Sequence, residues 1–446
     1  MRAGTAYQLT WWFYPGRGRA LRTLLASFGA SISSHMPSAT DVRMHGFARR
    51  SEVPAVVDWI GRHCPVLDAE SVAPEEAAGR VLAADIVSPL DVPGFDRAAM
   101  DGYALRGAET AGASEYNPLA FPVLGQSMPG QPFGNAVPVN AAVRIMTGAP
   151  VPDALDAVVP AEYAIETAGR IEITRPVAPG QHVGHVGEDI GKGTAALRAG
   201  RRLRPQDVGL IASLGLARVS VVKRPRVRIL VTGNEVRAPG ETKGPYQIYD
   251  ANSYMLRGLV ARDGGLLETH RRLGDDPDEI RAALLAPGAE IILVSGGSSV
   301  GSEDYAPRLI AEIGELAIHG VAMRPSSPAG VGRIGDTLVF LLPGNPVSCL
   351  CAYDFFAGRA LRLRGGRPAD WPHRTVRRVV GRKIVSAIGR VDYCRVRIAD
   401  GLVEPIALSG ASMLSSTTRA DGFVIVPAES EGYGPDTEVT VYLYDD

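Results

Sequence analysis

The stretch Ile291-Ile292-Leu293-Val294-Ser295-Gly296-Gly297-Ser298-Ser299-Val300-Gly301-Ser302-Glu303-Asp304-Tyr305 decides the fold. Its first four residues are all apolar, which is typical of a strand buried on both faces. A glycine-rich bend follows, and residues 303–313 then have the pattern of a helix. Glycines between a strand and a helix let backbone N–H groups approach a phosphate closely. The bend is therefore a candidate phosphate site, and a purely structural turn is the alternative.

The same alternation of strand and helix continues on both sides of this stretch. Strands are predicted at 227–231 and 338–342. Helices are predicted at 252–263 and from 276 onwards, and one long final helix is predicted to begin at Asn345-Pro346. Such alternation predicts a doubly wound, mostly parallel α/β domain, which we place at 224–366. Ligands bind such sheets at the carboxyl ends of the strands, where the motifs that begin at Thr232, Ser295 and Pro343 all fall.

The rest of the chain predicts a multidomain protein that combines α/β and β parts. With 446 residues the chain is too long for a single core, and its 51 glycines and 33 prolines favour many turns. Helices are predicted at 54–60, 74–82 and 205–214, within N-terminal segments at 47–90 and 181–223. Short apolar runs separated by glycine and proline predict an inserted β domain at 91–180 and a small β-barrel-like C-terminal domain at 367–446.

Charge and cysteine content limit the classes of partner. The chain has 47 Lys and Arg against 48 Asp and Glu, so no global field recruits nucleic acid or an acidic membrane surface. The four cysteines form no Cys-x-x-Cys pair, which fits a reducing, cytoplasmic location. Cys349 and Cys351 are predicted to be core residues rather than redox or ligand groups. We expect no nucleic-acid partner and no membrane partner.

The first 40 residues contain no Asp or Glu and carry four arginines. Such composition is typical of a targeting peptide, and its apolar runs are too short to span a membrane. The alternative is that translation starts at Met36 or Met44. We expect residues 1–46 to be a leader that is disordered or not translated.

Three carboxylates are predicted at the edge of the sheet where the strands end. Glu235 follows the first strand, Asp250 precedes its helix, and Asp304 follows the glycine bend. Mg²⁺ binds through one or two carboxylates together with substrate phosphates, so these three residues are the predicted Mg²⁺ ligands. The alternative is that Asp250 and Asp304 only cap helices. The helix starts at the bend and at Asn345-Pro346 are expected to face one anionic ligand.

A second informative segment lies near the N-terminus. Pro93-Gly94-Phe95-Asp96-Arg97-Ala98-Ala99-Met100-Asp101-Gly102-Tyr103-Ala104 has no single apolar face, so it predicts a shaped loop anchored by Phe95 and Met100. Asp96 and Asp101 would project from this loop toward a ligand or metal. A solvated surface turn is the alternative.

Seven motifs occur together in a fixed order from about Arg50 to the C-terminus. They are the loop just quoted, Met146-Thr147-Gly148-Ala149-Pro150, Gly187-Glu188-Asp189-Ile190, Thr232-Gly233-Asn234-Glu235, Ile248-Tyr249-Asp250-Ala251-Asn252-Ser253, Ser295-Gly296-Gly297 and Pro343-Gly344-Asn345-Pro346-Val347-Ser348. In this order they resemble the molybdopterin molybdenumtransferase family, which includes the C-terminal part of gephyrin.

The resemblance implies a reaction, a cofactor and a quaternary structure. Family members take adenylylated molybdopterin and molybdate, release AMP and leave molybdenum on the dithiolene. The resemblance further implies that 181–223 packs against 47–90 as one discontinuous domain. It also implies a homodimer whose active site is shared between subunits, with Asp96, Asp101 and Thr147 reaching the partner's crevice.

The resemblance and the strand-end pattern together assign the site residues. Those expected to act in catalysis are Asp101, Glu235, Asp250, Asp304 and Arg324. Those expected to bind substrate are Asp96, Thr147, Asp189, Ser295, Gly296, Gly297, Ser299, Gly301, Pro343, Gly344, Asn345, Pro346, Ser348, Arg390 and Ser412. Mg²⁺ is the expected cofactor, and molybdate is a substrate.

The chain departs from the family pattern at two places. Where members usually have Lys-Pro-Gly-Lys-Pro, this chain has Arg324-Pro325-Ser326-Ser327-Pro328, and Asn234 stands where aspartate is more common. Loss of a compact ammonium could weaken binding of the molybdate dianion. A second hypothesis is therefore a paralogue that carries the pterin or finished cofactor to a client molybdoenzyme. A third hypothesis is pyrophosphate hydrolysis, although related hydrolases lack the inserted domain.

Overall fold

The computed structural model of this protein describes residues 47, 49–298, 304–407 and 410–444. The predicted leader at 1–46 and two predicted substrate-binding residues, Ser299 and Gly301, lie outside the described residues.

The central domain is built on a six-stranded sheet. Its strand order is β16 (Leu266–Leu273), β13 (Arg226–Thr232), β17 (Ile291–Ser295), β21 (Thr337–Leu342), β20 (Gly330–Ile334) and β18 (Glu315–His319). The first four strands pair in parallel, and β20 and β18 pair antiparallel at the edge. The prediction of a mostly parallel sheet is confirmed. All five residues of β17 are buried, because helices cover the strand on both faces.

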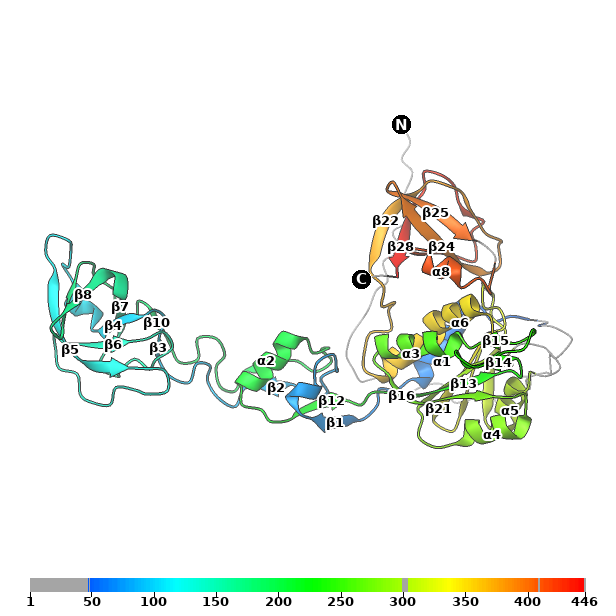
Figure 1. Cartoon of the computed structure of the whole chain (residues 1–446), viewed down its shortest axis with the longest axis horizontal. Coiled ribbons are helices and arrows are strands. Elements are labelled where there is room, and N and C mark those ends of the chain that lie inside the picture. The colour runs from blue at the N-terminus through cyan, green and yellow to red at the C-terminus, as the bar shows by residue number, and fades with distance from the viewer. Residues whose placement is uncertain (1–46, 48, 299–303, 408–409, 445–446) are drawn as a thin grey trace, which may run out of the picture. The chain divides into compact units, whose positions relative to one another are not determined.

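Side chains alternate between two cores, one on each face of this sheet. Ile291 and Leu293 pack with α1 (Val53–His63) and α3 (Asn252–Arg262), whereas neighbouring strand residues pack with α4 (Pro277–Leu285) and α5 (Ala306–Ile313). Figure 1 shows α1 and α3 on one face of the sheet and α4 and α5 on the other. This arrangement is the doubly wound architecture that the alternating pattern predicts.

Two helices of this domain differ from their predicted form. The helix predicted at 303–313 is described from Ala306 onward, with Pro307 in its first turn. The single long final helix is instead divided: α6 spans Pro346–Ala352, a π-helical turn spans Tyr353–Ala357, and α7 spans Gly358–Arg364.

Two segments that are far apart in sequence share a separate core. Strand β1 (Ala69–Val72) pairs with β12 (Val219–Val222), and β2 (Ile86–Val87) pairs with β11 (Ala195–Leu197). Helix α2 (Pro205–Ser213) packs on them, as its spacing predicts. The helix predicted at 74–82 is wrong, since only one 3₁₀ turn forms at Pro74–Glu76 and Gly79 then adopts a positive φ.

The chain between these segments forms a second sheet with its own cores. Its strand order is β7 (Ala157–Pro160), β4 (Gly102–Leu105), β6 (Ala142–Ile145), β5 (Leu119–Ser127), β9 (Arg170–Ile173) and β8 (Ala164–Thr167). Two short strands, β3 (Arg97–Ala98) and β10 (Val183–Gly184), pair beside it.

The C-terminal strands close into a small barrel, as predicted. The ring runs β24 (Val391–Ala399), β25 (Leu402–Ala407), β22 (Thr375–Val380), β28 (Glu438–Leu443) and β26 (Gly422–Val426), and β26 returns to β24. Valine side chains from these strands fill its interior. The short strand β19 (Met323–Arg324) of the central domain pairs in parallel with β24, which connects the two domains through backbone hydrogen bonds.

All four cysteines are buried and free. Burial raises the pKa of the Cys64, Cys349 and Cys394 thiols to about 12, so these groups stay protonated. The prediction that Cys349 and Cys351 are core residues is confirmed. Across the part of the chain that the structure describes, no helix is both long and apolar enough to cross a membrane.

Candidate active site

Two adjoining pockets lie at the strand ends and share the wall residues Pro328, Pro343 and Asn345. Their volumes are about 800 and 750 Å³. Together they form one divided crevice between the central sheet and the C-terminal barrel. Each half carries its own kind of charge.

The first half, which we call the arginine pocket, is lined by five arginines: Arg49, Arg50, Arg324, Arg390 and Arg395. The described lining residues of this pocket include no Asp or Glu. The second half, the carboxylate pocket, is lined by Glu235, Asp250, Asp275 and Asp304, and its described lining includes no Lys or Arg. Opposite charges on two sides of one crevice suit an oxyanion on one side and a metal-bound phosphate on the other.

The carboxylate pocket is built where three parallel strands end. The glycine bend after β17 folds tightly against Thr232 at the end of β13. Gly296 has a φ of +91°, and a Cβ atom there would lie 2.4 Å from the Thr232 carbonyl oxygen. At Gly297 a Cβ atom would lie 2.7 Å from the Thr232 hydroxyl. Only glycine fits at this approach, so the bend leaves its backbone open to the pocket.

Asn252 joins three of the sequence motifs, although it was not among the predicted site residues. Its side-chain Nδ2 donates to the Ser295 hydroxyl at 2.9 Å and to the Gly344 carbonyl at 2.8 Å. Asn252 is the first residue of α3, so one amide fixes the first helix of the domain to two neighbouring strand ends. Its only sequence signal is its place beside Asp250.

Asp250 holds the first turn of α3. Its Oδ1 accepts the backbone N–H of Ser253 at 3.0 Å, and its Oδ2 accepts the Ser253 hydroxyl at 2.5 Å. His270 Nε2 and Arg272 Nη1 lie 3.5 and 3.9 Å from the same Oδ2. These contacts support the capping role that the sequence left as an alternative. They also leave little of this carboxylate free for a metal.

The predicted Mg²⁺ ligands line one pocket without forming a three-ligand cluster. Within the described residues, no group of three or more His, Cys, Asp or Glu side chains is arranged to hold a metal ion. Glu235 folds back over Gly233, where a Cβ atom would lie 2.6 Å from its Oε2. Mg²⁺ usually takes only one or two protein carboxylates and completes its shell with phosphate and water. The pocket therefore fits Mg²⁺ that arrives with a phosphate rather than a dedicated protein site.

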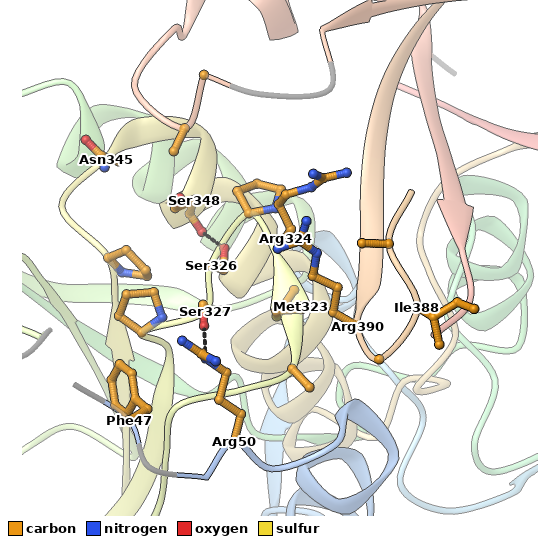
Figure 2. A pocket seen from close by; sticks show the side chains of 18 of the residues that line it. Phe47, Arg50, Met323, Arg324, Ser326, Ser327, Asn345, Ser348, Ile388 and Arg390 are labelled. Atoms are coloured by element: carbon orange, nitrogen blue, oxygen red, sulfur yellow. Dashed lines mark hydrogen bonds between the residues drawn. The ribbon is translucent and has the colours of Figure 1, made fainter. Parts of the chain in front are cut away.

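In the arginine pocket, one buried carboxylate orients two of the cations. Asp392 is 3% exposed and forms an ion pair with Arg324. Arg390 Nε lies 3.7 Å from the other oxygen of Asp392, and the Ser386 hydroxyl donates to Asp392 at 2.7 Å. Figure 2 shows Arg390 extending beside Arg324. Both arginines were predicted site residues, whereas the aspartate between them was not.

The Arg324–Pro328 turn departs from the family pattern and has its own contacts. Ser326 occupies the place of the pattern's glycine and has a φ of +85°, a conformation that favours glycine. Its hydroxyl donates to the Ser348 carbonyl. The Ser327 hydroxyl accepts a 2.7 Å hydrogen bond from Arg50 Nε, which Figure 2 shows. Arg50 was not among the predicted site residues.

A backbone N–H at the start of α6, expected to bind the ligand, instead forms a hydrogen bond within the protein. Pro346 has no N–H, and the Val347 N–H donates to the Ala411 carbonyl at 2.9 Å. This contact places Ser412 at the rim of the carboxylate pocket, which it lines with Gly344. Asn345 and Pro346 at the start of α6 line the carboxylate pocket, but the Val347 N–H is not available to a ligand, so an anion held by this helix start stays a prediction.

Four predicted site residues belong to the inserted sheet and its connections. Asp101 accepts the Thr147 backbone N–H at 2.6 Å and the Thr147 hydroxyl at 2.7 Å, and these bonds hold the pKa of Asp101 below its usual value. Asp96 accepts the Val186 N–H at 2.9 Å. The Asp189 backbone N–H donates to Val92 at 3.0 Å. The described residues that line the two pockets of this chain include none of these four.

Three regions of the chain match known protein families. Residues 50–215 match the MoeA N-terminal region (domain I and II), 228–362 match the probable molybdopterin binding domain, and 377–444 match the MoeA C-terminal region (domain IV).

Individual proteins are similar over most of the chain. Molybdopterin molybdenumtransferase 2 of Mycobacterium tuberculosis is 35% identical over 82% of this chain and 93% of its own length. Molybdopterin molybdenumtransferase of Haemophilus influenzae is 32% identical over 82% of this chain and 92% of its own. The crystal structure of the molybdopterin biosynthesis MoeA protein from Pyrococcus horikoshii matches with a TM-score of 0.74 and 32% identity, covering 89% of this chain and all of that chain.

Proposed function

Because this chain belongs to the molybdopterin molybdenumtransferase family, we propose that it transfers molybdenum from molybdate to molybdopterin during molybdenum cofactor biosynthesis. The observation that carries this proposal is the divided crevice, whose halves have opposite charge and share a wall. Molybdate is a dianion and belongs in the arginine pocket. The pterin substrate brings phosphate and belongs in the carboxylate pocket.

The proposed substrate is adenylylated molybdopterin, and AMP is the product that leaves. Gly297 lines this pocket and would offer its backbone N–H to the phosphates, whereas the Gly296 N–H donates to the Leu342 carbonyl at 3.2 Å. Asp304 and Glu235 line the same pocket and would hold Mg²⁺ against those phosphates. When bound, Mg²⁺ supplies charge neutralisation at the departing phosphate. Asp250 contributes by fixing the pocket wall through Ser253.

We also propose a homodimer in which the loop around Asp101 completes the partner's crevice. Thr147 keeps Asp101 ionised and fixed in direction, which suits a residue that presents charge to a ligand. Mixing inactive Asp101→Asn and Asp304→Asn chains should restore activity, because one crevice of each mixed dimer then has both carboxylates. Failure of confirmed mixed dimers to recover activity would contradict the shared site.

The direct test of the function is AMP release from adenylylated molybdopterin, measured with and without molybdate. A transferase couples the two, so AMP should appear with molybdate and molybdenum should remain on the pterin. Equal AMP release with and without molybdate would indicate hydrolysis. Binding of the pterin without AMP release in either condition would indicate a carrier that serves a client molybdoenzyme.

A further inference from the structure

The arginine pocket contains a cation from outside the strand-end motifs. Arg50 precedes α1 and lies 277 residues before Ser327, yet its Nε donates to the Ser327 hydroxyl (Figure 2). The resemblance to the family implies a second lysine at the position of Ser327 in this chain. We propose that Arg50 supplies the cation that this position lacks and binds the oxyanion in its place. The inference rests on the proposed function for the identity of the oxyanion, molybdate.

The backbone holds Arg50 at this place from both sides. The Ser51 N–H donates to the Gly320 carbonyl at 2.9 Å, and the Ala322 N–H donates to the Ser51 carbonyl at 2.8 Å. The Val321 N–H in turn donates to the Ser327 carbonyl at 2.8 Å. The residue after Arg50 and the residue that Arg50 contacts are thus fixed to the same three-residue segment. Their proximity follows from the fold rather than from a flexible side chain alone.

Aromatic packing supports the same position. The Arg50 guanidinium carbon lies 5.9 Å from the centre of the Phe47 ring, within the range of a cation–π contact. Phe47 packs edge-on against His319, with ring centres 4.9 Å apart. Gly320 makes room for this ring, since a Cβ atom there would lie 2.5 Å from Phe47.

The charges around Arg50 leave it available for a ligand. Arg324 and Arg390 already share the buried counter-ion Asp392. The described contacts of Arg50 are instead a hydroxyl and an aromatic ring, and neither neutralises its charge. A guanidinium also presents several donors in one plane, which suits the oxygens of a tetrahedral dianion. Arg50 is therefore placed to add both charge and hydrogen bonds to a bound molybdate.

The test is calorimetric titration of sodium molybdate into wild type, Arg50→Gln and a matched control at constant ionic strength. The control is Arg62→Gln, which removes an arginine of the same N-terminal segment whose described hydrogen bond stays within α1. We expect Arg50→Gln to weaken molybdate binding about tenfold, as for loss of a charge-assisted hydrogen bond. An affinity for Arg50→Gln within twofold of Arg62→Gln would overturn the inference.

Rescue by lysine separates a charge role from a fold effect. Ser327→Lys in the Arg50→Gln chain should restore molybdate affinity to within about threefold of wild type, because one cation again occupies the position. Ser327→Lys alone should change affinity less than about threefold, since the new ammonium would meet Arg50. If Ser327→Lys instead raised molybdate affinity by the same factor in wild type and in the Arg50→Gln chain, Arg50 would not fill this position. That result would overturn the inference. Arg50→Lys, which keeps the charge, should stay within about threefold of wild type.

Failure of the inference and failure of the proposed function give different results. Molybdate titration needs no pterin, and AMP release is measured separately. Molybdate binding that depends on Arg50 without molybdate-coupled AMP release would remove the function and keep the inference. Molybdate-coupled AMP release, together with a molybdate affinity that Arg50→Gln leaves unchanged, would keep the function and remove the inference. Absence of molybdate binding by wild type would remove both.

Discussion

The two halves of the crevice differ in how the chain builds them. The carboxylate pocket is formed mainly by residues at and after the ends of three neighbouring parallel strands of one sheet, β13, β17 and β21. The arginine pocket combines residues from five separate parts of the chain: Phe47 with Arg49 and Arg50, 322–328, residues between 343 and 348, residues between 387 and 395, and Gly410 with Ala411. The first is a consequence of α/β topology, and the second depends on contacts between a barrel, a sheet and an N-terminal segment. We expect the first to be sensitive to backbone changes and the second to changes of charge.

Gly296→Ala should have the largest effect on the carboxylate pocket. The added methyl group meets the Thr232 carbonyl at 2.4 Å in a backbone conformation that favours glycine. We expect a loss of about 3 kcal/mol of unfolding free energy and no measurable phosphate binding. Denaturant unfolding and nucleotide titration provide the measurement.

Gly335→Ala is the matched control, because Gly335 has a positive φ in the same domain but no atom within 4 Å of its added Cβ. It should cost only about 1 kcal/mol. Equal losses from the two substitutions would show that the tight approach to Thr232 is unimportant.

Arg324→Gln should destabilise the arginine pocket by a smaller amount. Among the described contacts of the buried Asp392, the substitution leaves the Ser386 hydroxyl and the more distant Arg390. Breaking a fully buried pair costs about 3–5 kcal/mol, and because Arg324 is 30% exposed we expect about 2 kcal/mol. The exposed Arg333–Glu315 pair is the control, and Arg333→Gln should cost less than about 0.5 kcal/mol. Similar unfolding midpoints for the two variants would contradict the role given to Asp392.

Acid should have a still smaller effect, through His319. Its Nε2 bonds to the Ser298 carbonyl at 2.8 Å, and burial lowers its pKa below the ordinary value. Below about pH 6.5 the unfolded chain therefore binds a proton that the folded chain resists, so this contribution to stability falls as pH falls. The slope is at most about 1.4 kcal/mol per pH unit, and His319→Gln should remove it. Identical pH dependence of unfolding in wild type and variant would contradict this assignment.

The difference between the pockets also explains what the sequence could predict. Continuous apolar runs such as those of β13 and β17 predicted the parallel strands, and the motifs after them predicted most of the carboxylate pocket. Arg50 and Asp392 were missed because their partners lie 277 and 68 residues away, and no periodicity encodes such a contact. The prediction of a helix at 74–82 was wrong because the helix propensity of these residues does not by itself determine their secondary structure.

The most direct test of a crevice divided by charge is a pair of titrations on two charge variants. Asp304→Asn removes a carboxylate from one half, and Arg390→Gln removes a cation from the other. Molybdate and Mg²⁺–ADP are titrated separately into each variant and into wild type. We expect Asp304→Asn to weaken Mg²⁺–ADP binding about tenfold with molybdate affinity unchanged, and Arg390→Gln to weaken only molybdate binding to a similar degree. Parallel losses of both ligands in both variants would contradict separate roles for the two halves.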